Sequence, residues 1–344
     1  MQQHPTQLWR HTALGTALII SAVLSLVACG SSAGSNTPST AATAAIAAPS
    51  IATTDSSPSP SAAHAEATAS PRPSATPAVR AAAVPAFSHI YLIVMENKEY
   101  GSIVGSSEAP YLNWLIRHYA LATNYYAITH PSEPNYVSLF SGSTQGIRDD
   151  GVHDFSGKNL ADELDAHGKT WRVFAENDPR GCYTGATSSD GEDGSGTYAR
   201  KHEPAISFTD ISRDRSRCGR ITDLGHFSPA TANFELIVPN MCHDMHDCSI
   251  RTGDSFLSMF VPRITQSSTF TNSVLFITWD EGSTSMGGGG HVATIAISQH
   301  IVAGIRSSIP HNHYSLLHTI ERAWALGCIG DTCTANDLGE LFRR

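Results

Sequence analysis

The sequence has 344 residues and a formal net charge of −9, and apolar residues make up 41% of it against 15% for charged residues. This length and composition are typical of one large or two ordinary globular domains. The acidic balance and the lack of a basic run in the sequence argue against nucleic-acid binding. We therefore expect no nucleic-acid partner, and we expect a monomer.

The first 28 residues have the pattern of an export signal. Arg10 precedes an apolar run over 13–28, which is too short to span a bilayer comfortably. The run ends in Leu26-Val27-Ala28-Cys29 and resembles a bacterial lipobox, in which the cysteine is lipid-modified and becomes the N-terminus. We predict a lipoprotein signal peptide over 1–28 and lipidation of Cys29, which would attach the protein to a membrane. The alternative is an ordinary signal peptide with an incidental cysteine.

Residues 29–86 consist mostly of Ala, Ser, Thr and Pro and show no apolar periodicity. Such a segment cannot bury enough apolar surface to order itself, so we predict a disordered linker. The folded domain is then expected over 87–344, either held at the bacterial cell envelope by the lipid anchor or secreted.

Apart from Cys29, the chain has six cysteines, an even number that indicates disulfides in an exported domain. Six cysteines allow fifteen pairings, and proximity in the sequence favours one of them. The expected pairs are Cys242–Cys248, Cys328–Cys333 and, from the two that remain, Cys182–Cys218. A zinc cluster is the alternative, but the sequence has no C-x-x-C pair and an oxidising compartment favours disulfides.

Nearly continuous apolar runs predict buried strands, and apolar residues at helical spacing predict helices between them. The expected strands are 87–95, 120–126, 170–175, 234–238, 273–279 and 292–298, and the expected helices are 110–120, 159–167, 255–264 and 314–326, with a further helix starting at 137. The alternation of strands and helices predicts a single α/β domain with a mostly parallel central sheet flanked by helices.

Polar residues follow several of these strands directly. Glu96-Asn97 follows the strand over 87–95, Pro239-Asn240 follows 234–238, and Asp280-Glu281 follows 273–279. In open α/β sheets, ligands bind beyond the carboxyl ends of the strands. We therefore expect these polar side chains to converge at one edge of the sheet.

The octapeptide Thr129-His130-Pro131-Ser132-Glu133-Pro134-Asn135-Tyr136 places a serine between two prolines. Proline fixes its own φ and disfavours helical geometry in the residue before it, so we expect Ser132 on a stiff, extended turn before a helix. A hydroxyl presented in this way suits nucleophilic catalysis on an electrophile. The alternative is a proline-stiffened loop with a capping serine.

Glu96, Asn97, Asp280 and Glu281 are candidate ligands for a divalent metal ion. Carboxylate and amide oxygens are the hard ligands that such cations prefer. A cation beside Ser132 would lower the pKa of its hydroxyl and stabilise charge on a phosphoryl group. Taken alone, an Asp-Glu pair after a strand is more often a cap or a turn.

Histidines and one lysine are candidates for proton transfer and phosphate binding. His202 lies beside Lys201, and His246 lies in the segment after Asn240. Histidine can donate a proton near neutral pH, as a departing oxygen requires. His291 follows four glycines that allow close approach of the backbone. For any one of these histidines the alternative is a surface or capping role.

Five blocks of this sequence together resemble one known family. The blocks are 96–97, 129–136, 198–204, 239–247 and 279–281. They are similar to the phosphoesterase family of bacterial acid phosphatases and phospholipases C, within the alkaline phosphatase superfamily, and most similar to its short secreted acid phosphatases. The resemblance covers roughly residues 87–330 and implies an alkaline-phosphatase-like domain.

The resemblance also implies roles for individual residues. Ser132 would be the nucleophile, with His202 and His246 near the phosphate. Glu96, Asn97, Asp280 and Glu281 would hold a metal ion. The residues then expected to contact substrate are His130, Asn135, Lys201, Asn240 and His291. The second metal site of the zinc phosphatases is not evident in the sequence, so we expect one divalent ion.

The leading functional prediction is an exported phosphomonoesterase that works through a phosphoserine, with phosphoinositide phosphates as one candidate substrate. A phospholipase C-type phosphodiesterase is the alternative, weakened because the long phospholipases carry an extra C-terminal domain and this sequence ends at Arg344. A sulfatase is set aside because Tyr136 stands where that family's motif needs arginine. A lipid-anchored module that binds without catalysis is a further alternative.

Overall fold

The computed structural model describes residues 83–179, 181–188 and 197–342. All of them belong to one unit, Ala75–Arg344. The expected signal peptide, Cys29 and nearly all of the expected linker lie outside the described residues, so these assignments remain predictions. Within the described part of the chain, no helix is both long enough and apolar enough to cross a membrane.

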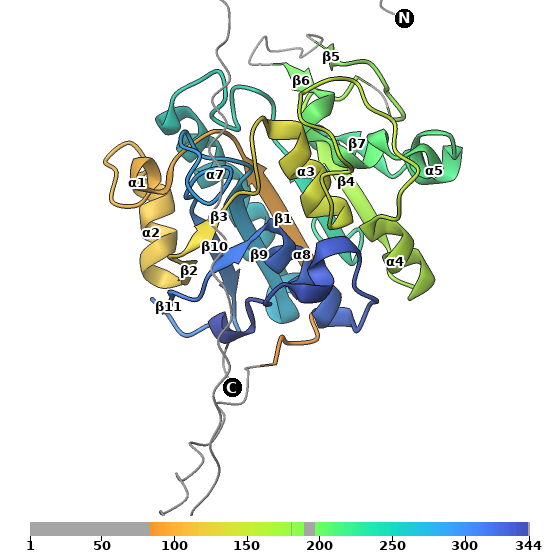
Figure 1. Ribbon diagram of the computed structural model, residues 1–344. Coiled ribbons are helices and arrows are strands. Elements are labelled where there is room, and N and C mark those ends of the chain that lie inside the picture. Colours follow the sequence, from red (N-terminus) through yellow and green to blue (C-terminus); the bar gives the residue numbers. More distant parts are fainter. Residues whose placement is uncertain (1–82, 180, 189–196, 343–344) are drawn as a thin grey trace, which may run out of the picture. The chain divides into compact units, whose positions relative to one another are not determined.

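An eight-stranded sheet runs through the described domain in the order β11-β2-β10-β9-β1-β8-β4-β7 (Figure 1). Its strands are β1 (His89–Met95), β2 (Ala120–Ala122), β4 (Trp171–Ala175), β7 (Ile221–Asp223), β8 (Phe234–Val238), β9 (Ser273–Trp279), β10 (Thr294–Ser298) and β11 (Arg306–Ser307). Two small sheets pair β3 (Tyr125–Tyr126) with β12 (His311–Asn312) and β5 (Thr187–Ser188) with β6 (Tyr198–Ala199). Of the strands in the large sheet, β10 alone runs antiparallel to its neighbours. The predicted α/β class with a mostly parallel sheet is confirmed.

The central strands β1 and β9 are apolar and buried over almost their whole length. A strand covered on both faces has no solvent side, and this explains why its sequence is a continuous apolar run. The two strands pair in parallel with Met95 opposite Trp279. The next residue of each strand, Glu96 and Asp280, therefore leaves the sheet at the same edge, which is the upper edge in Figure 1.

Helices cover both faces of the sheet. In Figure 1, α3 (Ser132–Ser141) and α8 (His313–Trp324) lie in front of the sheet and α7 (Ile250–Thr265) lies behind it. α3 packs against α8, and α2 (Pro110–His118) packs against α7. The remaining helices are α1 (Tyr100–Ile103), α4 (Leu160–Ala166), α5 (Thr209–Ser212), α6 (Arg215–Cys218), and the 3₁₀ turns η1 (Arg200–His202), η2 (Pro204–Ser207), η3 (Leu224–His226), η4 (Ser268–Asn272), η5 (Gly330–Thr334) and η6 (Gly339–Leu341).

The prediction of an extended turn at Ser132 is wrong, because α3 begins at Ser132 rather than at 137. Pro134 is tolerated there, since the first N–H groups of a helix have no intrahelical partner to lose. Gly142, with φ of 67°, ends the helix in the left-handed conformation that glycine adopts without strain. The serine therefore stands in the first turn of a buried helix.

Several other boundaries differ from the prediction by one or two residues, and two elements differ more. The helix expected at 255 begins at Ile250, because the Ser249 side chain accepts a hydrogen bond from the Thr252 N–H and caps it. The expected strand over 120–126 is divided into β2 and β3, which belong to different sheets. The three predicted disulfides are confirmed: Cys182–Cys218, Cys242–Cys248 and Cys328–Cys333.

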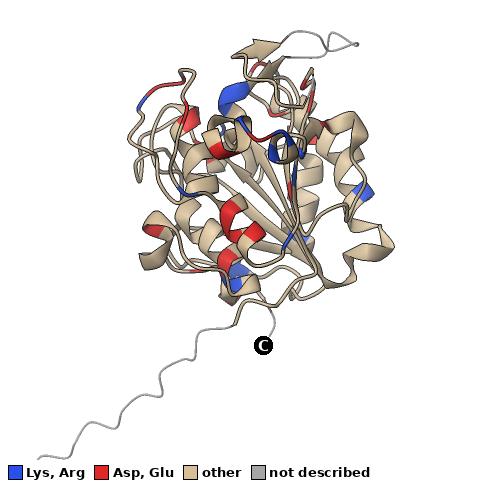
Figure 2. Cartoon of the chain, turned by 90° about the vertical axis from the view of Figure 1, so that its right-hand side faces the viewer, with Lys and Arg blue, Asp and Glu red and all other residues tan. Residues whose placement is uncertain are grey.

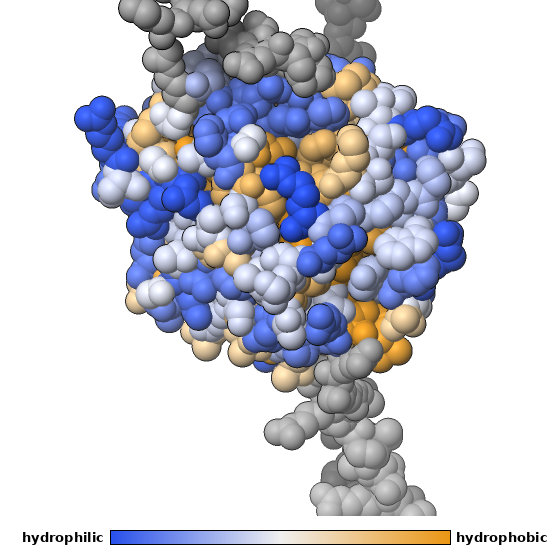
Figure 3. Space-filling model, turned by 180° about the vertical axis from the view of Figure 1, so that it is seen from behind, coloured by the Kyte–Doolittle hydropathy of each residue, from blue (hydrophilic) through white to orange (hydrophobic). Residues whose placement is uncertain are grey.

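Charged and apolar residues are distributed differently over the two faces shown in Figures 2 and 3. Figure 2 shows acidic and basic positions interspersed over one side of the described domain. Figure 3 shows the far face, where an apolar area near the centre is crossed and bordered by hydrophilic residues. On α7, Met259 is 70% exposed, and the Arg263 guanidinium lies over the rings of Phe227 and Phe260. The cation therefore covers part of the apolar surface by stacking on it.

A buried carboxyl group in the sheet gives the first testable prediction. Glu235 lies on β8 with no exposed surface, and burial raises its pKa to about 7. In the unfolded chain the pKa of Glu235 is about 4.5, so the protonated side chain favours the folded state. This contribution to the free energy of unfolding is lost as pH rises from about 4.5 to about 7. We expect Glu235→Gln to reduce the pH dependence of unfolding free energy between pH 5 and pH 8 by roughly 2–3 kcal/mol.

Urea unfolding of both proteins at the two pH values measures this difference. Other titrating groups are common to both proteins, so they cancel when the two pH dependences are compared. Equal pH dependence in Glu235→Gln and the unaltered protein would contradict the prediction.

Candidate active site

Ser132 lies at the carboxyl edge of the sheet beside a carboxylate from β1. Its Oγ donates a hydrogen bond to Glu96 Oε2 at 3.1 Å, and both side chains are buried. Burial raises the pKa of Asp280 and that of Glu281. A hydrogen bond with the Ser132 hydroxyl acts in the opposite direction and lowers the pKa of each. The hydroxyl therefore faces three carboxyl groups that come from the ends of two strands.

Asn97 joins the two strand ends. Its backbone N–H donates to Asp280 Oδ1 at 3.1 Å, and its side-chain amide donates to Glu96 Oε2 at 2.8 Å. The residue has φ of 53°, a left-handed conformation that asparagine tolerates better than most residues. Glu96, Asn97, Asp280 and Ser132 thus form one contiguous group, as the positions of the strand ends predict.

His202 is buried between two carboxylates. Its Nε2 lies 3.0 Å from Glu96 Oε1, and its Nδ1 lies 3.2 Å from Asp244 Oδ2. The ring of Tyr136, from α3, stacks on the imidazole at 5.0 Å. Asp244 was missed by sequence reasoning, although it lies within the 239–247 block; its backbone oxygen also accepts the Glu96 N–H at 2.8 Å. His246 lies close by, with ring centroids 6.0 Å apart, and its Nδ1 pairs with Asp247.

Asn135 and His130 hold the turn that leads into α3. The Asn135 amide oxygen accepts the N–H groups of Ile128 and Thr129, and its amide nitrogen donates to the Thr129 carbonyl. His130 Nδ1 lies 2.8 Å from Glu281 Oε2. These contacts fix the position of Ser132 relative to the strand that carries Glu281.

Lys201 brings a positive charge to the acidic group, by which we mean the carboxyl groups of Glu96, Asp244, Asp280 and Glu281. Its Nζ lies 2.9 Å from Asp150 Oδ2, while Asp150 Oδ1 accepts the N–H of Glu133 at 2.9 Å. Burial lowers the pKa of Lys201, but the bond to Asp150 and the charges of Glu96 and Asp280 outweigh burial and raise it overall. Asp150 was also missed by sequence reasoning, since it stands in a loop outside the five blocks.

The acidic group is electrostatically crowded. Burial, followed by the charges of Asp280 and Asp244, raises the pKa of Glu96 well above its ordinary value. Burial likewise raises the pKa of Asp244 to about 8 and that of Glu281 to about 7. Burial and the charge of Lys201 lower the pKa of His202 well below its ordinary value. The crowding arises because the fold removes these charges from water and places them together.

Two expected substrate contacts have other partners in this structure. Asn240 donates to Asn177 at 2.7 Å, and its side-chain oxygen accepts the N–H groups of Cys242 and His243. The His291 ring stacks between Tyr100 and Tyr126, with centroid distances of 4.2 and 5.0 Å. Within the described residues, the contacts of neither side chain include Ser132.

The donors of this group are chemically suited to a hard cation, although they are not arranged as a finished metal site. Within the described ranges, no set of three or more His, Cys, Asp and Glu side chains stands in a metal-binding arrangement. However, the buried oxygen Asp280 Oδ2 has no hydrogen-bond donor in the described part of the chain. Buried carboxylate oxygens without donors are costly unless a cation meets them.

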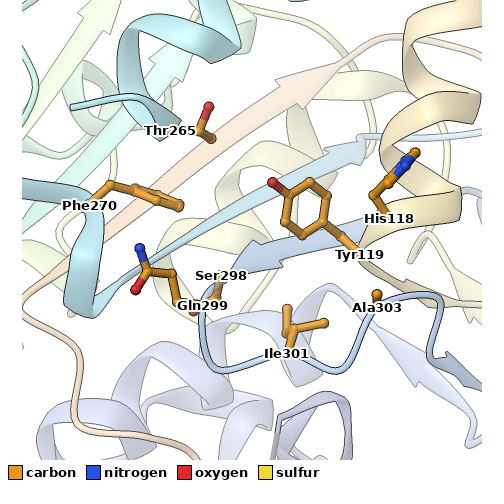
Figure 4. Close-up of a pocket in the computed structure, with 8 residues that line it drawn as sticks. All are labelled: His118, Tyr119, Thr265, Phe270, Ser298, Gln299, Ile301 and Ala303. Carbon is orange, nitrogen blue, oxygen red and sulfur yellow. The ribbon is translucent and has the colours of Figure 1, made fainter. Parts of the chain in front are cut away.

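A separate pocket of about 280 Å³ lies at the opposite edge of the sheet (Figure 4). Tyr119, Phe270 and Gln299 are among its lining residues, which come from the end of α2, from η4 and from the turn after β10. No acidic or basic residue other than His118 lines it in the described structure. This pocket therefore lacks the charged groups that phosphoryl chemistry needs, and it is not the candidate active site.

Comparison with known proteins places the chain in a family. The model of the Phosphoesterase family matches residues 103–327. The phosphatidylinositol-3-phosphatase of Mycobacterium tuberculosis (strain ATCC 25618 / H37Rv) is 31% identical over 264 residues, which cover 76% of this chain and 85% of that protein. The acid phosphatase of Aspergillus fumigatus (strain ATCC MYA-4609 / CBS 101355 / FGSC A1100 / Af293) is 28% identical, covering 74% of this chain and 58% of that protein.

Among solved structures, the lipoteichoic acid synthase LtaP from Listeria monocytogenes aligns with a TM-score of 0.52 and 9% identity, covering 74% of this chain and 77% of that chain. This similarity concerns the fold alone. The sequence matches go further, and they define a hydrolase that acts on phosphoric ester bonds. The chain belongs to the Phosphoesterase family, so the resemblance stated from the sequence is confirmed.

The contacts of Asp150 generate a second prediction. Asp150→Ala removes the acceptor of both the Lys201 ammonium and the Glu133 N–H, so Lys201 loses the partner that holds it beside the acidic group. Because hydrogen bonds to charged groups contribute about 1.5–3 kcal/mol, we expect KM for a phosphate monoester to rise about tenfold or more. Steady-state kinetics measure this change.

Asp149→Ala is the matched control, because the neighbouring Asp149 is 71% exposed and pairs with His153. An exposed pair of this kind contributes little, so KM should stay within about twofold of the starting value. Equal effects of the two substitutions would show that Lys201 does not depend on Asp150.

Proposed function

We propose that this protein is an exported phosphomonoesterase in which Ser132 attacks phosphorus. The observation that carries the proposal is the Ser132 hydroxyl, which stands at the start of a buried helix 3.1 Å from Glu96 Oε2. A hydroxyl is a weak nucleophile until a neighbouring group accepts its proton or lowers its pKa. Family membership supports phosphoric ester hydrolysis, and this geometry supports the choice of Ser132 among the serines of the chain.

The reaction proceeds in two displacements. In the first, Ser132 Oγ forms a bond to phosphorus, the ester P–O bond breaks, and the alcohol leaves with a proton. In the second, water attacks the phosphoserine, the bond to Oγ breaks, and inorganic phosphate is released. Glu96 Oε2 faces the serine proton at the start, and Lys201 lies where it can balance phosphoryl charge.

The two histidines have different parts in this proposal. His202 is buried between Glu96 and Asp244, so it orients Glu96 toward the serine. His246 is partly exposed and paired with Asp247, so it can exchange protons with water and donate one to the departing alcohol. His130 and Asn135 position the turn that carries the nucleophile.

We further propose that Glu96, Asn97, Asp280 and Glu281 hold one divalent metal ion. The buried oxygen Asp280 Oδ2, which has no hydrogen-bond donor in the described part of the chain, supports the proposal, as does the family's place among phosphate-ester hydrolases. When bound, such an ion would neutralise phosphoryl charge and lower the pKa of the serine hydroxyl. The residues themselves align Ser132 for attack whether or not they also contact the ion.

Export, lipid attachment at Cys29 and a monomeric state complete the proposal. The three disulfides support an oxidising compartment outside the cytosol.

A phosphoinositide monoester is a candidate substrate, because a relative that is 31% identical is named a phosphatidylinositol-3-phosphatase. A phospholipase C-type diesterase differs in its product, so release of diacylglycerol from phosphatidylcholine, without phosphate from monoesters, would favour it. A module that binds without catalysis would show no turnover.

Replacement of the nucleophile gives the third prediction. Ser132→Ala should lower phosphate release from a monoester at least about a thousandfold, because the covalent step has no other nucleophile. The fold should persist, as measured by thermal melting. Ser138→Ala, the same substitution at a buried serine further along α3, should retain activity. Turnover by Ser132→Ala close to that of Ser138→Ala would refute the assignment.

The metal proposal gives the fourth prediction. Asp280→Asn keeps the shape of the side chain but removes one charge, so activity and affinity for Mg²⁺, Mn²⁺ or Ca²⁺ should fall together. Calorimetric titration measures ion binding, and assays with and without chelator measure ion dependence. Full activity in chelator, with no ion binding to the unaltered protein, would argue against a metal.

A further inference from the structure

A small pocket adjoins the candidate active site on the side of Lys201. It has a volume of about 110 Å³ and lies between the loop at 150–152, the β5–β6 pair and the segment after β8. The ion pair between Asp150 and Lys201 belongs to its lining. Asp150 also accepts the N–H of Glu133, the residue after Ser132, so a hydrogen bond connects the lining of the pocket to the helix that carries the nucleophile.

The rest of the lining is mostly apolar. Val152, Ala186, Ala199 and Met241 all line the pocket, and the Val152 side chain is 57% exposed to water. A single exposed valine is ordinary on a protein surface. Here Val152 forms part of a concave apolar wall beside the Asp150–Lys201 ion pair of the candidate active site. Concave apolar walls with few polar groups are typical of ligand sites.

The charged groups of the lining are already paired. Arg200 is buried, and its guanidinium donates to the carbonyls of Thr184 and His153 and to Asp154. Lys201 is held by Asp150. Among the described residues, the pocket lining therefore has no unpaired cation for a second phosphate group, and its apolar walls offer few partners to the hydroxyl groups of a polyol.

We propose that this pocket receives the apolar part of the alcohol that leaves from a phosphate monoester. The phosphoryl group would lie at Ser132 and Lys201, and a short alkyl chain or the edge of an aryl ring would lie against Val152 and Met241. At about 30 Å³ for a water-sized group, the pocket has room for about four carbon atoms. This inference rests on the proposed function and selects among its candidate substrates. It favours esters of apolar alcohols over esters of hydroxyl-rich alcohols such as glycerol and inositol, and so over the phosphoinositide monoester.

Two primary-alcohol esters test the inference, n-butyl phosphate and glycerol 3-phosphate. Their leaving groups differ mainly in hydroxyl content, so chemistry at phosphorus is similar for both. We expect the unaltered protein to have at least about tenfold higher kcat/KM for the butyl ester, because small differences in apolar contact change specificity by about this factor. The preference should appear mainly in KM.

Val152→Thr is the informative variant, because it replaces one methyl group by a hydroxyl at constant shape. The ratio of kcat/KM for the butyl ester to that for the glycerol ester should fall about threefold to tenfold. Met241→Gln, which keeps the length of the side chain, should lower the ratio in the same way. Val302→Thr is the matched control, since Val302 is 53% exposed and follows β10 at the opposite edge of the sheet.

The outcomes separate this inference from the proposed function. Phosphate release from both esters without preference for the butyl ester would overturn the inference and leave the phosphatase activity standing. An unchanged ratio in both Val152→Thr and Met241→Gln, or an equal change in Val302→Thr, would also overturn it. No phosphate release from either ester by the unaltered protein would overturn the proposed function and the inference together.

Discussion

Met95 on β1 pairs with Trp279 on β9, and the residue that follows each of them carries a buried carboxyl group. Parallel pairing in this register places Glu96 and Asp280 at the same edge of the sheet. α3 then presents Ser132 to Glu96 at 3.1 Å, and Asn97 connects both carboxylates. A shift of the register by one residue would turn one carboxylate to the other face of the sheet and separate the group.

The carboxylates at this edge act against the stability of the fold. Burial raises the pKa values of Glu96, Asp244 and Asp280 because ionised groups lose their water there. Lys201, His202 and the N–H of Asn97 offset part of that cost. The remaining cost in folding free energy is offset by the apolar packing of β1, β8 and β9, whose side chains are almost all buried. The buried carboxylates and Ser132 are therefore held in place by apolar strands.

The parts of the site at strand ends could be predicted from the sequence, and other parts could not. Glu96 and Asp280 follow apolar runs, and strand direction alone places them together. Asp244 and Asp150 stand in irregular segments whose path depends on the packing of distant elements. The buried amide of Asn135 holds the turn before Ser132, although the motif suggested a substrate contact for it. A motif identifies which residues stay close in sequence, but the contacts of a side chain depend on what the fold brings beside it.

From the amino-acid sequence alone we could predict the α/β class, the strands whose ends carry the acidic residues, the pairing of the six cysteines and the serine between two prolines. These features depend on local order along the chain, through apolar periodicity, strand direction and proximity. The packing of the elements in three dimensions was needed to show that Ser132 begins a helix, that Asp244 faces His202, and that Asp150 links Lys201 to α3. Such contacts join residues tens of positions apart, and their geometry depends on how whole elements pack together.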